Sequence, residues 1–297
     1  MPVPPCRVAS VIQNAAAICP IYLFLTRMHE EKTTALVTEE LIIDSQLLQH
    51  TVTLSCFLPG NVQKPEDMGL LLINDGQDMK TMGFAGILED LLVNHEIEPL
   101  LCVAIHTGKE RMAEYGTAHT ADYMGRGAKA GLYTRFVFEE LLPFIHFTYG
   151  IASFKEKSFA GFSLGGLSAL DIVWNHPQEF SRVGVFSGSL WWRIKGLDDG
   201  YNEETDRIMH QQVKQGVFQP WLKFFFEIGA LDETMDRNNN GIIDAIDDTL
   251  SLVDELVAKG YHPQQDIYYL ELRDGRHDVA TWGRAMPVFL KWGWGRK

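Results

Sequence analysis

The sequence predicts an α/β fold in which a mostly parallel, eight-stranded sheet carries helices on both faces. From residue 34 onward, short apolar and β-branched runs alternate with segments of helical spacing, as in parallel strands joined by crossover helices. The first two runs, 34–43 and 51–59, have no helical segment between them and predict an antiparallel pair. No linker or repeat divides residues 34–297, so we expect one domain.

The other elements follow in strict alternation. Strands are predicted at 70–75, 100–107, 158–163, 182–188, 222–229 and 266–272. The first two of these are continuously apolar, as expected of strands buried on both faces. Helices are predicted at 82–96, 133–147, 165–175, 203–215, 248–259 and 279–294.

The composition predicts a large core and excludes two kinds of partner. The chain has 297 residues, of which 46% are hydrophobic, enough to bury one large core. Its 26 basic and 39 acidic residues give a net charge of -13, and no run of lysine or arginine interrupts that balance. Because this charge repels nucleic-acid phosphates and anionic lipid, neither nucleic acid nor a membrane is an expected partner.

Residues 1–33 are predicted to form a poorly ordered extension. They contain an apolar run at 15–25, but Pro20 interrupts it and no small-residue cleavage site follows, which disfavours a signal peptide. The four cysteines are too far apart for a zinc site and read as free thiols. We expect a cytoplasmic protein; a secreted or periplasmic location and a start at Met28 instead of Met1 stay open.

The segment FAGFSLGGLSAL (159–170) carries Gly161, Ser163 and Gly165 as G-x-S-x-G between a predicted strand and a predicted helix. A sharp turn of this kind holds the serine in a strained conformation, and the glycines let strand and helix approach closely. The hydroxyl is then exposed beside the first helical N–H groups. Ser163 is the predicted nucleophile; the alternative is a glycine-rich turn that happens to contain serine.

A serine nucleophile needs a base and an acid that orients it. The α/β-hydrolase fold supplies the base from the loop after the last strand and the acid from the loop after the strand before. His277 follows the eighth predicted strand and Asp232 the seventh, so the order Ser, Asp, His agrees with that fold. Glu233 and, more weakly, Asp278 are alternatives for the acid.

Two further features belong to the predicted site. An oxyanion hole requires two backbone N–H groups; Leu164, next to the nucleophile, supplies one, and Gln77, in the turn after the third strand, the other, with Asp78 as an alternative. Trp191 and Trp192 follow the sixth strand. They either form a pocket wall that stacks on an acyl or aromatic group of the substrate or pack in the core.

Five segments together resemble the putative-esterase branch of the α/β-hydrolases, which includes enterochelin esterases, S-formylglutathione hydrolases, feruloyl esterases and mycolyltransferases. They are LLLINDGQDM (70–79), FAGFSLGGLSAL (159–170), VFSGSLWW (185–192), EIGALDE (227–233) and GRHDVATWGRAMPVFLKW (275–292). The resemblance covers about residues 34–295. It implies a serine esterase that acts on a small-molecule ester, with Ser163 as nucleophile and His277 as base and no organic cofactor.

The substrate is left open among small, aryl and siderophore-like esters. SLWW (189–192) resembles the siderophore-esterase members most, yet the basic residues expected around an anionic catecholate siderophore are sparse. They are Lys109, Arg111, Arg126, Lys129 and Arg193. An acyltransferase or thioesterase with the same machinery, and a non-catalytic binding protein of this fold, are the alternatives. The oligomeric state is not predicted.

Residues 236–247 follow the ligand spacing of an EF-hand calcium loop, with Gly241 at the sharp turn. The predicted ligands are Asp236, Asn238, Asn240, the Ile242 carbonyl, Asp244 and Asp247. Since a strand precedes it, the loop resembles the calcium loop of dockerins more than a paired EF-hand. The alternative is an Asn/Gly-rich turn capped at the next helix. Because the loop starts four residues after Asp232, we expect a structural calcium ion that stiffens the acid loop.

Overall fold

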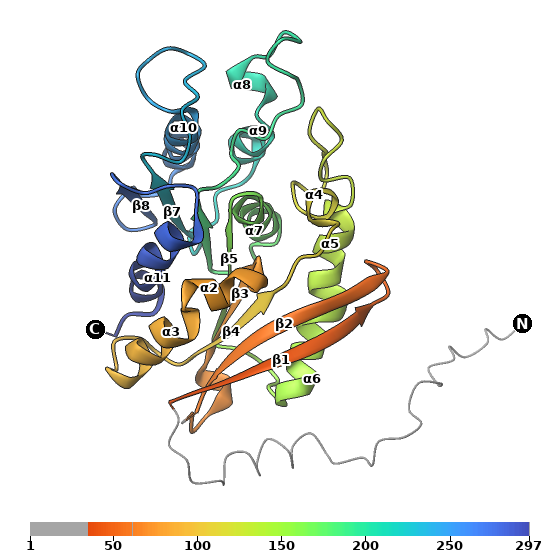
Figure 1. Ribbon diagram of the computed structural model, residues 1–297, viewed down its shortest axis with the longest axis vertical. Helices are drawn as coiled ribbons and strands as arrows, with labels where there is room; N and C mark the ends of the chain where they lie inside the picture. The colour runs from red at the N-terminus through yellow and green to blue at the C-terminus, as the bar shows by residue number, and fades with distance from the viewer. Residues whose placement is uncertain (1–34, 61, 297) are drawn as a thin grey trace, which may run out of the picture.

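The computed structural model describes residues 35–60 and 62–296, so the predicted extension at 1–33 lies outside the described residues. One sheet of eight strands has the order β1-β2-β4-β3-β5-β6-β7-β8 (Figure 1). β1 pairs antiparallel with β2, and β2 with β4, whereas the other neighbours are parallel. The strands are Leu36–Ser45, His50–Pro59, Gly69–Asn74, Leu100–Ile105, Glu156–Phe162, Arg182–Phe186, Lys223–Gly229 and Ile267–Leu272. The predicted sheet is confirmed.

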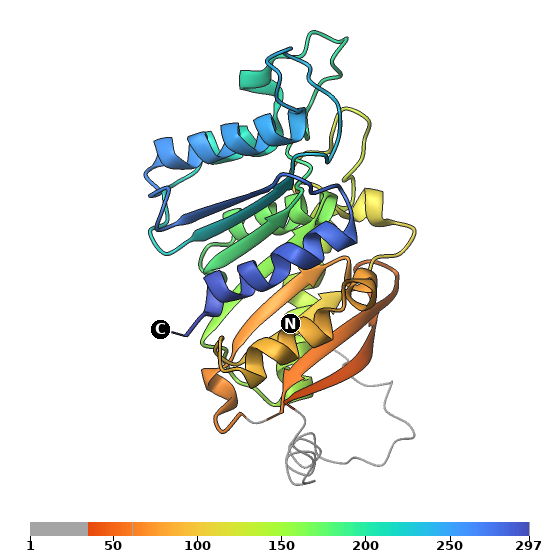
Figure 2. The same ribbon diagram turned by 60° about the vertical axis from the view of Figure 1, so that its left-hand side comes forward.

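Helices cover both faces of the sheet (Figures 1 and 2). One face carries α2 (Met79–Met82), α3 (Phe84–Val93) and α11 (Val279–Trp294). The other carries α5 (Ala130–Phe136), the π-helical turn η3 (Val137–Leu141), α6 (Leu142–Tyr149), α7 (Leu164–Asn175), α9 (Ile208–Gln215) and α10 (Asp244–Lys259). The short elements η1 (Pro65–Asp67), η2 (Gly76–Asp78), α4 (Arg111–Glu114) and α8 (Glu203–Asp206) lie in the connections.

The central strands are apolar along their whole length because both of their faces are covered. All residues of β3 and β4 are buried. Side chains alternate between faces along a strand, so Leu70 and Leu72 of β3 join one core cluster and Leu71 and Ile73 join the other. Burial on two sides therefore accounts for the continuous apolar runs in the sequence.

Two predicted helices differ from the structure at identifiable residues. The helix predicted at 203–215 is broken at Arg207, which has extended backbone angles (φ -78°, ψ 111°) and pairs its guanidinium with buried Asp248 at 2.9 Å. The helix predicted from residue 248 begins at Asp244, because the Glu233 carboxylate accepts a hydrogen bond from Ala245 N at 2.7 Å and caps an extra turn. No helix in the described part of the chain is long and apolar enough to cross a membrane.

The chemistry-bearing residues leave the sheet at one edge. β3, β5, β7 and β8 are parallel, and their carboxyl ends are followed by Asp75, Ser163, Asp232 and His277, respectively. Crevices at the carboxyl ends of parallel strands are where open α/β sheets bind ligands. This edge therefore holds the candidate functional site.

Replacing Gly161 with alanine should destabilise the protein, because a Cβ there would overlap the backbone of Gly165 and Gly166 at the start of α7. We expect the free energy of unfolding, measured with denaturant, to fall by about 1–3 kcal/mol. Gly86 in α3 is the matched control, since a Cβ there has nothing within 4 Å, and alanine should be neutral or slightly stabilising. Equal losses in both variants would contradict the close approach of β5 and α7.

Candidate functional site

Ser163 occupies a strained turn between β5 and α7. Its backbone has φ 54° and ψ -121°, a combination that side chains with a Cβ rarely adopt. The turn is held by a hydrogen bond from Ser163 N to Phe186 O of 2.8 Å. The half-buried Ser163 hydroxyl has the Ser189 Oγ at 3.4 Å.

The backbone N–H groups of the first turn of α7 directly follow Ser163 in the chain. The first N–H groups of a helix have no acceptor within the helix and attract negative charge, and Leu164 is the first residue of α7. Gln77, the other predicted donor, lies in η2 after β3, where Asp75 adopts a left-handed conformation (φ 61°) to turn the chain. The structure thus places both predicted donors at the carboxyl edge of the sheet.

A polar cluster joins the Gln77 loop to the turn of Ser163, and it was not predicted from the sequence. The Arg111 guanidinium binds both carboxylate oxygens of Asp75, with Nε–Oδ1 at 2.7 Å and Nη2–Oδ2 at 2.8 Å. Asn74 Nδ2 donates to Gly165 O at 2.8 Å, and Tyr133 Oη donates to Asn74 Oδ1 at 2.5 Å. These bonds fix the end of β3 against the start of α7.

His277 and Asp232 form a hydrogen-bonded pair after β8 and β7. Nδ1 of His277 lies 3.2 Å from Oδ2 of Asp232, whose side chain is 1% exposed, whereas that of His277 is 41% exposed. The His277 ring meets the edge of Trp282 at 5.4 Å, and Trp282 stacks on Phe162 at 5.0 Å. Because Phe162 precedes Ser163, Trp282 links the histidine loop to the nucleophile strand.

The two alternative acids are engaged in helix capping. Glu233 accepts from Ala245 N at the start of α10, and Asp278 accepts from Thr281 N at 2.8 Å at the start of α11. Of the three candidate acids, Asp232 is the one in contact with His277.

A buried acid not anticipated from the sequence lies on the same strand as the acid loop. Glu227 of β7 is 1% exposed. Burial raises its pKa to about 8, and the nearby Asp232 carboxylate adds to the shift. Burial therefore favours the neutral form of the Glu227 carboxyl group.

The two tryptophans lie in different environments. Trp192 is fully buried beneath Gly116 and Gly127. Trp191 is partly exposed, and the guanidinium groups of Arg126 and Arg193 lie 4.8 Å and 5.8 Å from its ring. Trp191 is thus the member of the pair that presents surface beside the site, together with two cations.

The loop at 236–247 gathers several of its predicted ligands. Asp247 Oδ2 accepts from the amides of Asn238 and Asn240 at 2.8 and 2.7 Å, and Asp236 accepts from Gly241 N at 2.9 Å. Asp244 instead accepts from Arg237 N at 2.8 Å. Ile242 is exposed. Among residues 35–60 and 62–296, no three His, Cys, Asp or Glu side chains are grouped to hold a metal ion.

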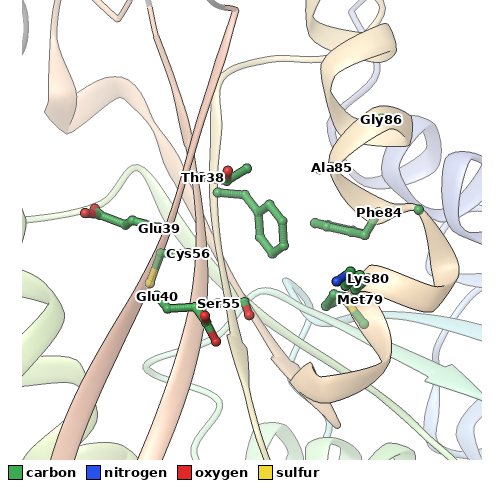
Figure 3. Close-up of a pocket in the computed structure, with 12 residues that line it drawn as sticks. Thr38, Glu39, Glu40, Ser55, Cys56, Met79, Lys80, Phe84, Ala85 and Gly86 are labelled. Atoms are coloured by element: carbon green, nitrogen blue, oxygen red, sulfur yellow. The ribbon is translucent and has the colours of Figure 1, made fainter.

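A cavity of about 440 Å³ lies away from these residues, between the β1–β2 pair and the helices α2 and α3. Figure 3 shows Phe84, Met79 and Lys80 on its helical side and Ser55 on its strand side. None of the predicted site residues lines it.

The eight-stranded sheet with helices on both faces is an α/β-hydrolase fold. The chain belongs to the esterase family whose model is described as "Putative esterase", which matches residues 45–292.

Individual relatives are distant. The iron(III) enterobactin esterase of Escherichia coli strain K12 is 24% identical over 250 residues, which are 82% of this chain and 54% of that protein. The chain thus spans about half the length of this curated relative. The solved enterochelin esterase of Shigella flexneri superposes with a TM-score of 0.64 at 23% identity, over 86% of this chain and 58% of that one. A ferulic acid esterase gives a TM-score of 0.65 at 17% identity, over 88% and 98%.

Proposed function

We propose that this protein is a serine esterase, a carboxylic ester hydrolase that works through an acyl-enzyme. The observation that carries the proposal is the shared edge of the sheet, where the strained turn of Ser163 and the Asp232–His277 pair meet through Trp282. Family membership supports the same reaction class.

The reaction follows from the roles of these groups. His277 accepts the Ser163 proton as Ser163 attacks the ester carbonyl, and Asp232 keeps Nδ1 of His277 protonated so that Nε2 acts as base. The N–H groups of Leu164 and Gln77 stabilise the oxyanion. His277 then protonates the leaving alcohol and activates the water that releases the acyl group.

The substrate we propose is an aryl or siderophore-like ester with negative charge. The support is the partly exposed ring of Trp191 beside Arg193, which has no carboxylate partner in the described structure, a surface on which an anionic aromatic group gains both stacking and charge. Trp191 is two residues from Ser189, whose hydroxyl adjoins Ser163. The relatives' names, iron(III) enterobactin esterase and ferulic acid esterase, agree with a siderophore-like or aromatic ester.

We also propose that the loop at 236–247 holds a structural calcium ion. Asp236, Asn238, Asn240 and Asp247 already converge, and rotation of the Asn238 and Asn240 amides would turn their oxygens toward an ion among them. Asp244, the Ile242 carbonyl and water complete an oxygen set of the kind calcium prefers. The ion would act through the backbone, since Asp244 N donates to Met235 O at 2.8 Å beside the acid loop, and it has no step in the chemistry.

Replacing Ser163 with alanine should abolish hydrolysis of p-nitrophenyl esters and labelling by a fluorophosphonate, because both need the nucleophile. Circular dichroism should show an intact fold. Ser189→Ala is the matched control. The Ser189 hydroxyl lies 3.4 Å from that of Ser163, but Ser189 is not in the strained turn, so this variant should still be labelled. Activity near wild type in Ser163→Ala would refute the assignment, and transfer to added alcohol in place of water would identify an acyltransferase.

Arg193 is the residue to replace in a test of the proposed substrate, because it has no carboxylate partner in the described structure. Replacing Arg126 would instead leave the buried Asp122 carboxylate without its partner. We expect Arg193→Met to lower kcat/KM for a carboxylate-bearing aryl ester about fivefold relative to a neutral one, the size of a partly screened charge contact. Arg135→Met, on the exposed surface of α5, should leave this ratio unchanged. A ratio unchanged in Arg193→Met would argue against anion recognition there.

Calcium should raise the thermal unfolding midpoint of the wild type, and EGTA should reverse the rise. At about 100 times the dissociation constant, the ion adds roughly 2.7 kcal/mol to the free energy of unfolding. Asp236→Asn with Asp247→Asn should remove the rise, whereas Asp254→Asn, on an exposed position of α10, should keep it. A wild-type midpoint indifferent to calcium, magnesium and EGTA would leave the loop as a plain turn.

A further inference from the structure

The mechanism above leaves the buried acid Glu227 without a role. Glu227 is 1% exposed on β7, the strand beside the edge strand β8, and it pairs with Phe186 of β6 and Leu270 of β8. Neither of its carboxyl oxygens has a hydrogen-bond partner of good geometry among the described residues, although the backbone N–H of Ser187 lies near enough to oppose the raised pKa. Burying a carboxyl group without a partner is unfavourable, so a specific contact is expected here.

The unpaired oxygen of Asp232 lies on the same face of β7. Side chains at alternate positions of a strand share a face, so the Cβ direction of Gly229 is that of Glu227. A Cβ added at Gly229 would collide with Oδ1 of Asp232. Oδ1 of Asp232 therefore lies over Gly229. Gly229 is the next residue after Glu227 on the same face of β7, about 7 Å further along the strand.

Each of the two carboxyl groups has what the other lacks. Oδ2 of Asp232 is occupied by His277, whereas Oδ1 is buried with no partner. Both oxygens of Glu227 are buried without a hydrogen-bond partner, and the neutral form of a carboxyl group has one O–H to donate. One hydrogen bond between them satisfies both groups.

The other charged groups around Glu227 have partners elsewhere. From α11, Arg284 opposes the raised pKa of Glu227 and the Asp278 carboxylate adds to it. Arg284 is paired with Asp274 at 2.6 Å, and Asp278 caps α11. From β8, Tyr269 donates to Glu271 at 3.0 Å. Asp232 is the neighbour with an open acceptor.

We propose that Glu227 is a positioning residue whose neutral carboxyl group donates a hydrogen bond to Oδ1 of Asp232, directly or through one buried water. The inference rests on the proposed function. The bond restrains rotation of the Asp232 carboxylate, so that Oδ2 stays aligned with Nδ1 of His277. The proton remains on Glu227 throughout the reaction. When Glu227 ionises, the donor is lost and two negative charges adjoin in a buried site, so His277 loses its alignment.

Two substitutions at Glu227 distinguish the effect of the hydrogen-bond donor from the effect of side-chain size. Glu227→Gln keeps a donor and cannot ionise, whereas Glu227→Met keeps the length and removes the donor. We expect the rate of fluorophosphonate labelling at pH 7 to be largely retained in Glu227→Gln and to fall about tenfold in Glu227→Met, as for loss of a hydrogen bond to a charged acceptor. The wild-type rate should decline as the pH rises past about 8, and Glu227→Gln should lack this decline. Glu271→Gln, on the neighbouring strand, should keep the wild-type profile.

Three results would overturn the proposal in variants that unfold cooperatively. They are a wild-type labelling rate in Glu227→Met, a tenfold loss in both variants, and an alkaline decline that persists in Glu227→Gln. A purely structural residue would alter the unfolding midpoint without changing the pH profile.

Infrared spectroscopy tests the same contact without activity. The wild type at pH 7 should show the carbonyl band of a neutral carboxylic acid that Glu227→Gln lacks, and Asp232→Asn should shift that band. An absent or unshifted band contradicts the hydrogen bond. A wild type that shows both effects yet resists labelling would contradict the proposed esterase function and leave the contact between the two acids standing.

Discussion

The left-handed backbone at Ser163 is the constraint on which the rest of the site depends. A residue with a Cβ holds φ 54° and ψ -121° only if the surroundings leave it no alternative. Here they are the backbone of β6, which accepts from Ser163 N, and the contact of Gly161 with the start of α7. A substituent at Gly161 has no room, so the glycines of the motif are determined by packing. The same turn lies at the edge of the sheet where β7 and β8 also end.

The second constraint is the buried charge that holds the loop of Gln77, the proposed oxyanion donor. Asp75 is buried, with φ 61°, and such an acid needs a fixed partner. Arg111 supplies it with two hydrogen bonds from α4 and also reaches Phe162 O at 3.4 Å. One guanidinium therefore joins the end of β3, which carries Gln77, to the end of β5, which carries Ser163. Preorganised donors stabilise an oxyanion only if this geometry is stiff.

The sequence predicted the features that depend on local pattern. Strand positions followed from apolar runs, and Ser163, Asp232 and His277 followed from the order in which strand ends meet at one edge. The break at Arg207 was not predictable, because it depends on a buried ion pair with Asp248, 41 residues away. Asp75–Arg111 was missed for the same reason. The sequence alone does not show which carboxylate will be buried beside which cation.

Glu227 shows a different limitation. The sequence FFFEIG shows a single charged residue in an apolar strand, but it does not show which face of the sheet that residue occupies. Period-two alternation gives its face only once the ends of β7 are known. Its closeness to Asp232 then depends on the turn at Gly229, which brings the carboxylate back over its own strand. Asp232, the proposed partner of the base, and Glu227, proposed to orient Asp232, thus come from one strand and its following loop.

The number of basic residues around the site does not show how much positive charge is available to a substrate. Three of the cations counted in the sequence bind carboxylates of the protein: Arg111 with Asp75, Arg126 with Asp122 and Lys129 with Glu110. Arg193 instead lies over Tyr123, Trp191 and Tyr201, at 5.1–5.8 Å from their ring centres. Aromatic faces hold a guanidinium without neutralising it. In a chain of net charge -13, one cation kept in this way leaves a local positive charge that counting basic residues does not reveal.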